Sequence, residues 1–301
     1  MCDIVVPLDG TSCAEQALPW GQAIATRTGG TLHLVQVDLP LRVPTCQEVL
    51  GQRRGDALRR LAEERRDRER AYLREIEAGL LRGAERPRVE TALLRGPLWS
   101  ALLEHGERAG ATLFVVATRA RQPLNRAWLG SVTDDLIRRS RVPVLLIRAH
   151  EEFAGAAPGL GRLLVPLDGS SGAERVIPHA VALARAFDAE LQLVRVCGPR
   201  EDALEAERYL AEVRARLRPT GVAAESLIVA HHDVAEALAD AAEERGAEVL
   251  ALASRYRGGL SRLVFGNIPE SLVRLGSRPV FVVGERVPAP HGADTRVVAW
   301  S

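Results

Sequence analysis

Short apolar runs alternate along this chain with longer segments of helical periodicity, and the whole pattern occurs twice. Apolar runs bounded by Gly, Pro or polar residues are typical of buried strands. In the first copy these runs predict strands over 3–8, 32–37, 88–94, 112–117 and 142–147. In the second copy the matching runs are 164–167, 191–196, 225–230, 248–253 and 279–283.

Helical segments separate these strands. The first copy predicts helices over 13–28, 56–81 and 98–109, and a further helix that begins near Val132. The second copy predicts helices over 197–217 and 234–245, and a further helix that begins near Ile268. Strands that alternate with helices favour βαβ units, a right-handed parallel sheet and therefore an α/β fold. Pro19 and Pro178 lie at matching places in the first helix of each copy, so we expect that helix to be kinked or to begin late.

The strongest repeat is a strand end followed by a carboxylate and a tight turn. Val5-Val6-Pro7-Leu8-Asp9-Gly10 returns as Leu164-Val165-Pro166-Leu167-Asp168-Gly169. A Ser-x-x-Glu pattern follows each copy, at 12–15 and 171–174, and predicts a capping box. Strand, turn and helix N-terminus form the usual ligand-facing corner of an open parallel sheet. For each Asp two roles stay open: contact with a ligand, or a simple turn or cap.

Length and repeat together predict two domains over 1–149 and 160–285, with a tail over 286–301. The first copy carries about 23 extra residues after its second strand, an insertion near 38–60. An insertion beside a ligand corner is either a lid or an ordinary surface loop. The last strand of each copy would leave an apolar edge open, so we expect the copies to pair through these strands as an intramolecular pseudo-dimer.

Composition and charge limit the kinds of binding partner that we expect. The 301 residues are 47% apolar and 26% charged, as in soluble globular proteins. A net charge of +1 gives no electrostatic reason to expect nucleic acid or an acidic membrane as partner. No apolar run approaches the roughly 20 residues that span a bilayer, and the chain opens directly on a strand, so we expect a cytoplasmic protein. Four cysteines (Cys2, Cys13, Cys46 and Cys197) lack metal-ligand spacing, so no metal site is expected from them.

The last third of each copy carries a further pattern. Residues 257–266 read Arg-Gly-Gly-Leu-Ser-Arg-Leu-Val-Phe-Gly and lead to an Arg-Pro-Val-Phe-Val-Val strand at 278–283, with a weaker form at 126–132 and 141–147. Together with the repeated corner, these segments resemble the universal stress protein family, in a tandem form that covers nearly the whole chain. The resemblance implies two flavodoxin-like, Rossmann-like domains. Each would be a five-stranded parallel sheet of order 3-2-1-4-5 with helices on both faces.

The resemblance also implies a site for ATP or AMP, with Mg, where the strand order reverses. In nucleotide-binding members of the family, the backbone of a Val at the end of strand 2 contacts adenine. An Asp after strand 1 holds ribose or Mg. A G-x2-G-x9-G-[S/T] motif for the phosphates follows strand 4. The matching positions in the first copy are Pro7, Leu8, Asp9, Val37, Ala117, Arg119, Ala120, Gly130, Ser131 and Val132. In the degenerate second copy they are Pro166, Leu167, Asp168, Val196, Ala253, Tyr256, Gly266 and Asn267.

The glycine motif is incomplete in both copies. Glycine lets backbone N–H groups close on phosphate, and Ala117 and Ala120 replace it in the first copy at a cost of about 1 kcal/mol per strained position. Tyr256 is too large for the matching place, so we expect one nucleotide site, in the first copy, or none. Arginines at 119, 121, 255 and 257 either bind phosphate through their side chains or are solvated surface.

Three functions are compatible with this pattern. The first is a stress-response module that binds an adenine nucleotide as a small molecule. The second is a scaffold of the same fold that binds partner proteins without nucleotide, as the intrachain pair alone or as a homodimer. The third, an adenylyl-transfer or ATP-hydrolysing enzyme, lacks the S-G-G-x-D-S motif expected after strand 1, so we expect no catalytic residues. His231-His232-Asp233 stands at a strand end, and we expect it to form a turn.

Overall fold

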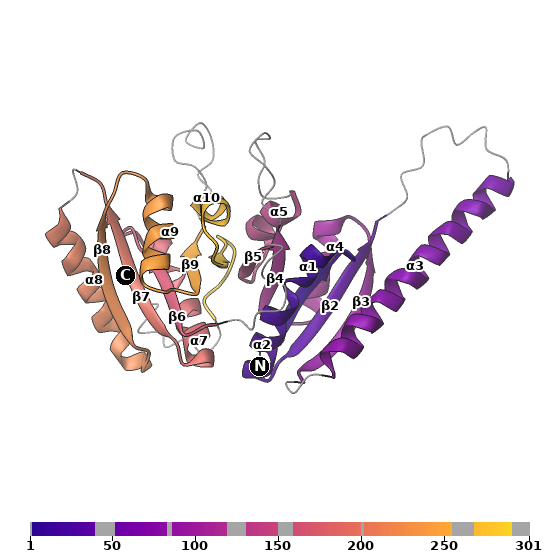
Figure 1. Cartoon of the computed structure of the whole chain (residues 1–301), viewed down its shortest axis with the longest axis horizontal. Helices are drawn as coiled ribbons and strands as arrows, with labels where there is room; N and C mark the ends of the chain where they lie inside the picture. Colours follow the sequence, from indigo (N-terminus) through magenta and orange to yellow (C-terminus); the bar gives the residue numbers. More distant parts are fainter. Residues whose placement is uncertain are drawn as a thin grey trace.

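The computed structural model describes residues 2–39, 52–82, 86–118, 131–149, 159–199, 202–254 and 268–290. Within these ranges ten strands form one continuous sheet in the order β3-β2-β1-β4-β5-β10-β9-β6-β7-β8 (Figure 1). The first half holds β1 (Ile4–Leu8), β2 (Thr31–Asp38), β3 (Arg88–Arg95), β4 (Leu113–Thr118) and β5 (Val144–Arg148). The second half holds β6 (Arg162–Pro166), β7 (Glu190–Cys197), β8 (Ala224–Ala230), β9 (Val249–Ala253) and β10 (Val280–Val283).

Helices cover both faces of this sheet (Figure 1). The first half carries α1 (Ser12–Glu15), α2 (Leu18–Thr28), α3 (Gln52–Leu80), α4 (Leu98–Arg108) and α5 (Ser131–Arg139). The second half carries α6 (Ser171–Glu174), α7 (Ile177–Phe187), α8 (Ala203–Leu217), the 3-10 turn η2 (Arg218–Thr220), α9 (Val234–Glu244) and α10 (Ile268–Leu275). The expected α/β class with a mostly parallel sheet is confirmed.

The sheet separates two apolar cores. Along β1, Ile4 and Val6 belong to one core and Val5 to the other, because successive side chains of a strand point to opposite faces. The first core lies under α2, α3, α7 and α8, and the second under α4, α5, α9 and α10. Both cores contain residues of both halves, so each core is continuous across the junction.

The two halves join through their last strands. β5 and β10 pair antiparallel, with Val280 opposite Leu146, Phe281 opposite Leu145 and Val282 opposite Val144, whereas all other strand pairs of the described sheet are parallel. Helices α2 and α7 also meet across the junction. The expected pairing of the two copies within one chain is therefore confirmed.

The interior prolines interrupt no helix. Helix α1 ends at Glu15 and α2 begins only at Leu18, so Pro19 lies in the first turn of α2, where its missing N–H breaks no intrahelical hydrogen bond. Pro178 has the same place in α7. The expectation that these helices begin late is confirmed.

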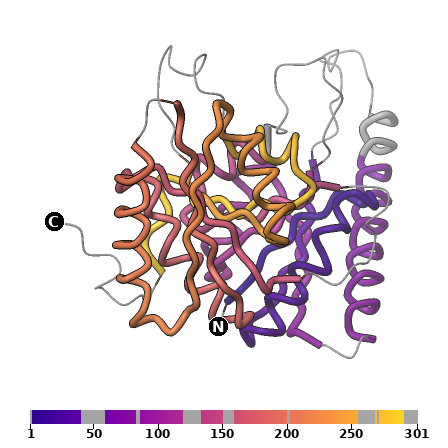
Figure 2. Tube along the Cα trace, turned by 60° about the vertical axis from the view of Figure 1, so that its left-hand side comes forward, coloured from indigo at the N-terminus to yellow at the C-terminus, as the bar shows by residue number. Residues whose placement is uncertain are grey.

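Helix α3 differs from the prediction. Residues 52–55, which the sequence assigned to a loop, belong to this helix, because a single Gly55 among helix-forming residues costs only about 1 kcal/mol. At 29 residues α3 is almost twice as long as α8, and Figure 1 shows it extending past the sheet. In Figure 2 the later turns of α3 run along one side of the molecule. Residues 40–51, for which a lid was one hypothesis, lie outside the described residues. Among those described, no helix is both long and apolar enough to cross a membrane.

The segment after β10 folds back on the second half. The Arg175 guanidinium donates hydrogen bonds to the carbonyl oxygens of Gly284 and Val287, and Val287 is buried in the first core. Burial lowers the pKa of His179 to about 4, although this ring is also hydrogen-bonded to the backbone of Pro288. The first residues of the predicted tail therefore pack on α7.

Substitution at the junction tests whether the two halves unfold together. We expect Phe281→Ala to destabilise the whole chain by about 3–5 kcal/mol, because Phe281 is buried where the halves share a core. Urea unfolding should keep one cooperative transition. Leu204→Ala, at an exposed position of α8, is the control and should change stability by about 0.5 kcal/mol or less. Two separate transitions in the unsubstituted chain would contradict a shared core.

Candidate functional site

Each half has one point where connections leave adjacent strands in opposite directions. In the first half this point lies between β1 and β4, and in the second between β6 and β9. Ligands of open α/β sheets bind outside the carboxyl ends of the strands at such points. We call these two places the first corner and the second corner.

The structure brings the described site residues of the first copy to the first corner. Pro7 and Leu8 end β1 and pair with Val35 and Gln36 of β2, so Val37 lies one residue beyond the paired region. Ala117 lies near the end of β4, which contacts α1. Ser131 and Val132 open α5, and the first N–H groups of a helix have no partner within the helix.

The second corner has the same plan. Pro166 ends β6, Leu167 follows it in the extended chain, and the N–H of Leu167 donates to the carbonyl oxygen of Val194 in β7. Val196 precedes the last residue of β7, and Ala253 ends β9. The motif residues Arg119, Ala120, Gly130, Tyr256, Gly266 and Asn267 lie outside the described residues, so their predicted roles stay predictions.

Both aspartates form a turn with the hydroxyl residue two positions later. Asp9 Oδ1 accepts hydrogen bonds from the N–H of Thr11 (3.0 Å) and from its hydroxyl (2.6 Å). Asp168 Oδ1 accepts the same pair from Ser170, at 3.0 and 2.5 Å. The turn role that the sequence left open is therefore present, and in both copies it occupies the same carboxylate oxygen.

The glycine after each aspartate has a backbone conformation that other residues rarely adopt. Gly10 has φ +79° and Gly169 has φ +82°. A Cβ on Gly10 would meet no described atom within 4 Å, whereas a Cβ on Gly169 would lie 2.6 Å from Nη1 of Arg195. Among the described residues, therefore, nothing lies over the first turn, whereas a guanidinium group covers the second.

Arg195 marks the clearest difference between the corners. It stands in β7 one residue before Val196, and the matching residue of β2 is Gln36. Gln36 is buried, and its Oε1 finds no hydrogen-bond partner within the described part of the chain. Periodicity in the sequence does not reveal this exchange, because both side chains fit a strand end.

The predicted capping boxes are wrong by one position. The caps are Thr11 and Ser170, whose hydroxyl oxygens accept hydrogen bonds from the N–H groups of Ala14 (3.3 Å) and Ala173 (3.2 Å). With the cap one residue earlier, Glu15 and Glu174 stand one place too far along the helix for a capping box.

The two glutamates bind tyrosines of distant helices instead. The Tyr72 hydroxyl donates to Glu15 Oε1 at 2.9 Å, and the Tyr209 hydroxyl donates to Glu174 Oε1 at 2.7 Å. Burial, then the glutamate hydrogen bond and charge, raise the pKa of each tyrosine, so both stay protonated donors. Sequence reasoning missed this repeated contact, although a Tyr-Leu-x-Glu pattern at 72–75 and 209–212 is its signal.

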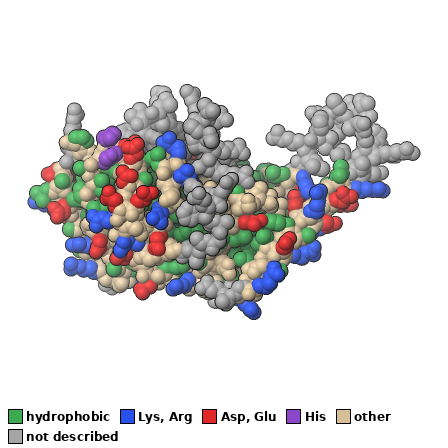
Figure 3. All heavy atoms as spheres, viewed as in Figure 1, with side chains coloured by type: hydrophobic (Ala, Val, Ile, Leu, Met, Phe, Trp, Pro, Cys, Tyr) green, Lys and Arg blue, Asp and Glu red, His purple; other side chains and the backbone are tan. Residues whose placement is uncertain are grey.

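The histidine cluster forms a turn, as expected. Asp233 caps α9 by accepting hydrogen bonds from the N–H groups of Ala235 and Glu236 at 2.8 and 3.1 Å. The Glu236 N–H, more than any other group, lowers the pKa of Asp233. His231 stacks on His232 with ring centroids 4.5 Å apart. Histidine side chains reach the surface on the face shown in Figure 3. No three His, Cys, Asp or Glu residues of the described ranges are placed to hold a metal ion.

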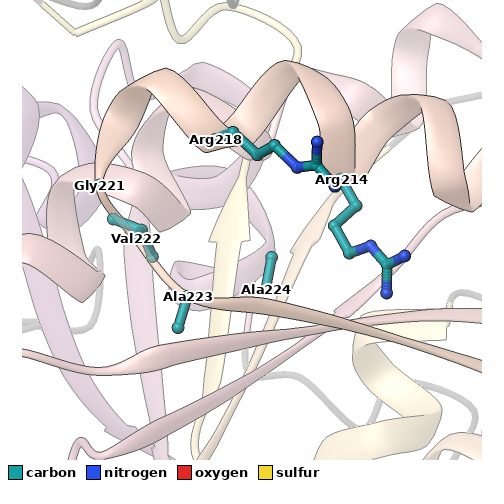
Figure 4. Close-up of a pocket in the computed structure, with 6 residues that line it drawn as sticks. All are labelled: Arg214, Arg218, Gly221, Val222, Ala223 and Ala224. Carbon is teal, nitrogen blue, oxygen red and sulfur yellow. The ribbon is translucent and has the colours of Figure 1, made fainter.

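A surface pocket lies away from both corners. It has a volume of about 460 Å³ and is lined by Arg214, Arg218 and residues 221–224, with both arginine side chains over the start of β8 (Figure 4). The corner of this half lies at the other ends of the parallel strands. The pocket also adjoins the C-terminal end of α8, whose carbonyl groups disfavour an anion. It therefore adds nothing to the second corner.

Known proteins share this architecture. The model of the universal stress protein family matches residues 2–148 and 159–284. Universal stress protein Rv2623 of Mycobacterium tuberculosis H37Rv is 27% identical over 303 residues, which cover 94% of this chain and 96% of that protein. The structure of a universal stress protein from Archaeoglobus fulgidus DSM 4304 aligns with 94% of this chain and 98% of that protein's chain, with a TM-score of 0.71 and 19% identity. The two proteins therefore share the fold. A universal stress protein solved in complex with cAMP covers 42% of this chain and 97% of its own, at 22% identity and a TM-score of 0.37.

Alanine at the two turn glycines tests the difference between the corners. We expect Gly10→Ala to cost about 1–2 kcal/mol through the left-handed backbone alone. Gly169→Ala should cost the same backbone strain and only slightly more in total, because the flexible end of the Arg195 side chain must also move. Gly79→Ala in α3 is the control and should stabilise by about 1 kcal/mol, since that site is open and helical. A smaller loss at Gly169 than at Gly10, measured by urea unfolding, would contradict the covered second corner.

Proposed function

The chain belongs to the universal stress protein family, and we propose that it is a stress-response protein that binds ATP or AMP at its first corner without catalysing a reaction. The observation that carries the proposal is the open turn after Asp9, at the switch point of the first half. No described atom would meet a Cβ at Gly10, so the described residues leave this backbone accessible to a ligand.

The residues of the first corner fit an adenine nucleotide. In this proposal the backbone at Val37 contacts adenine, and Asp9 holds ribose or Mg through the carboxylate oxygen that Thr11 does not use. The N-terminus of α5 at Ser131 supplies N–H groups and a favourable helix dipole for phosphate. Glycine-motif positions 117 and 120 carry alanine, so we expect weaker binding than a full motif gives.

The second corner fits a nucleotide less well. Arg195 already lies against the Asp168–Gly169 turn, where ribose or Mg would contact the carboxylate in the family's site. This observation favours a second candidate function for the second half, a scaffold whose corner is filled by a side chain. We therefore propose one nucleotide per chain.

We propose binding rather than catalysis for a chemical reason. The described polar groups at the first corner bond to each other in a turn, and among the described residues there we find no pair that resembles a nucleophile with its general base. In this proposal the domains extend over 1–149 and 160–285, and the protein acts in the cytoplasm.

Calorimetry with ATP and Mg tests the proposal. We expect a stoichiometry near one per chain. Asp9→Ala should weaken binding about 10- to 100-fold, the effect of losing one hydrogen bond or contact to a charged group. Asp168→Ala is the matched control at the second corner and should barely change the affinity. Two equal sites, or loss of binding in Asp168→Ala alone, would overturn the assignment to the first corner.

Nucleotide content of the purified protein gives an independent check. We expect acid release to yield adenine nucleotide, seen by its ultraviolet spectrum, from the unsubstituted chain and less from Asp9→Ala. A protein that carries no nucleotide and gives no heat with ATP, ADP or AMP would favour the scaffold function for both halves.

A further inference from the structure

Helix α3 contacts both walls of the first corner. One wall is the Asp9 turn with α1, and the other is the end of β2 at Val37 and Asp38. The helix packs on β2 and β3. Its contacts to the corner come from two places on its length, around Arg65 and around Tyr72.

The first contact is a pair of arginines on a buried carboxylate. Asp38 follows Val37 directly, and its side chain is only 7% exposed. The Arg65 guanidinium pairs with Asp38 Oδ1, and Arg66 Nε donates to Oδ2 at 2.9 Å. Both carboxylate oxygens are thus bound by α3. Removing one partner of such a buried pair leaves an uncompensated charge, which is costly.

Arg65 also fixes the chain beyond Asp38. Its Nη2 donates to the carbonyl oxygen of Leu39 at 2.7 Å, and its Nε lies 3.5 Å from Glu69 Oε1 one turn along the helix. Burial, followed by the nearby Asp38 charge, raises the pKa of Glu69. The two arginines and two carboxylates form one compact cluster. It sets the position of the backbone on which the proposed adenine contact depends.

The second contact is the hydrogen bond from Tyr72 to Glu15. Glu15 ends α1, the short helix that begins directly after the Asp9 turn. The Asp9 charge also contributes to the raised pKa of Tyr72, so this hydroxyl lies within reach of the carboxylate's field. Leu73, the next residue, is 2% exposed and packs in the first core.

Helix α3 continues toward its N-terminus beyond these contacts. Residues 59–61 are exposed, with Leu61 at 53%, whereas the side chains of Arg65 and Arg66 are only 26% and 29% exposed. Residues 52–64, which precede Arg65 in the helix, extend over about 20 Å at 1.5 Å per residue. Figure 1 shows this end of α3 beyond the sheet. The docked part of the helix begins where it binds Asp38.

The second half has only one of the two contacts. Cys197 stands where the first half has Asp38, so no carboxylate at that place can bind arginines of α8. Tyr209 still binds Glu174, and Arg216 Nη2 donates to Glu174 Oε2 at 3.0 Å. Binding of both walls by one helix is thus a property of the first corner.

We propose that docking of α3 and binding of nucleotide at the first corner stabilise each other, so that nucleotide regulates how firmly α3 is held. This inference rests on the proposed function. A nucleotide that uses the Val37 backbone and Asp9 binds best when both walls are fixed, and the contacts of α3 fix both. Because coupling between two binding events is reciprocal, nucleotide must then strengthen α3 docking by the same factor. Arg65, Arg66 and Tyr72 act as positioning residues in this scheme.

Hydrogen exchange and calorimetry on the full chain test the coupling. We expect ATP with Mg to slow amide exchange in residues 59–72 of α3 severalfold. Asp38→Asn keeps the side-chain size but removes the charge that both arginines bind. It should weaken ATP binding about tenfold, within the usual range of coupling, and lose the ATP-dependent slowing. Tyr72→Phe, which keeps the ring and its packing, should show a smaller change of the same kind.

Arg70→Gln is the matched control on the same helix. Arg70 pairs only with exposed Asp67 at 3.3 Å among its described contacts, away from the corner, so ATP affinity and exchange should equal those of the unsubstituted chain. If ATP binds but exchange in α3 does not change, or if Asp38→Asn and Tyr72→Phe both bind ATP normally, the coupling is wrong and the proposed function stands. No heat with ATP, ADP or AMP in the unsubstituted chain would overturn both.

Discussion

The antiparallel pairing of β5 with β10 is the contact on which the rest of the structure depends. A parallel half that ended at β5 would present the strand Val144–Arg148 as an open apolar edge, a form that natural sheets avoid. Pairing with β10 satisfies the backbone of both strands and makes the two cores continuous across the chain. The positions of both corners follow, because each is defined by strands that are anchored to this junction.

Around that junction the two halves use the same local chemistry. An aspartate after the first strand binds the N–H and hydroxyl of the next Thr or Ser, and a glycine with positive φ completes the turn. A tyrosine on the long helix then holds the glutamate that ends the short one. The halves differ in the residues that surround this unit. The first half has Gln36 where the second has Arg195, and Asp38 where the second has Cys197.

The strands, the late start of α2 and the pairing of the halves could be predicted from sequence, because each depends on a local pattern that occurs twice. The helix caps were misplaced because Thr11 and Ser12 both carry a hydroxyl, and the partner that decides the role of Glu15 lies far away, at Tyr72. The Asp38 cluster was missed for the same reason, since its arginines come from another element. Contacts between distant side chains leave no periodic signal in one sequence.

Arg195 has a consequence that reaches beyond the second corner. In a dimer of two identical chains, two-fold symmetry forces the same residue into both copies of any site. Here one chain supplies both halves, so a substitution in one half need not be repeated in the other. Because both halves belong to one chain, the two corners need not be identical. Gln36 and Arg195 occupy equivalent positions of the one sheet and differ in size and charge.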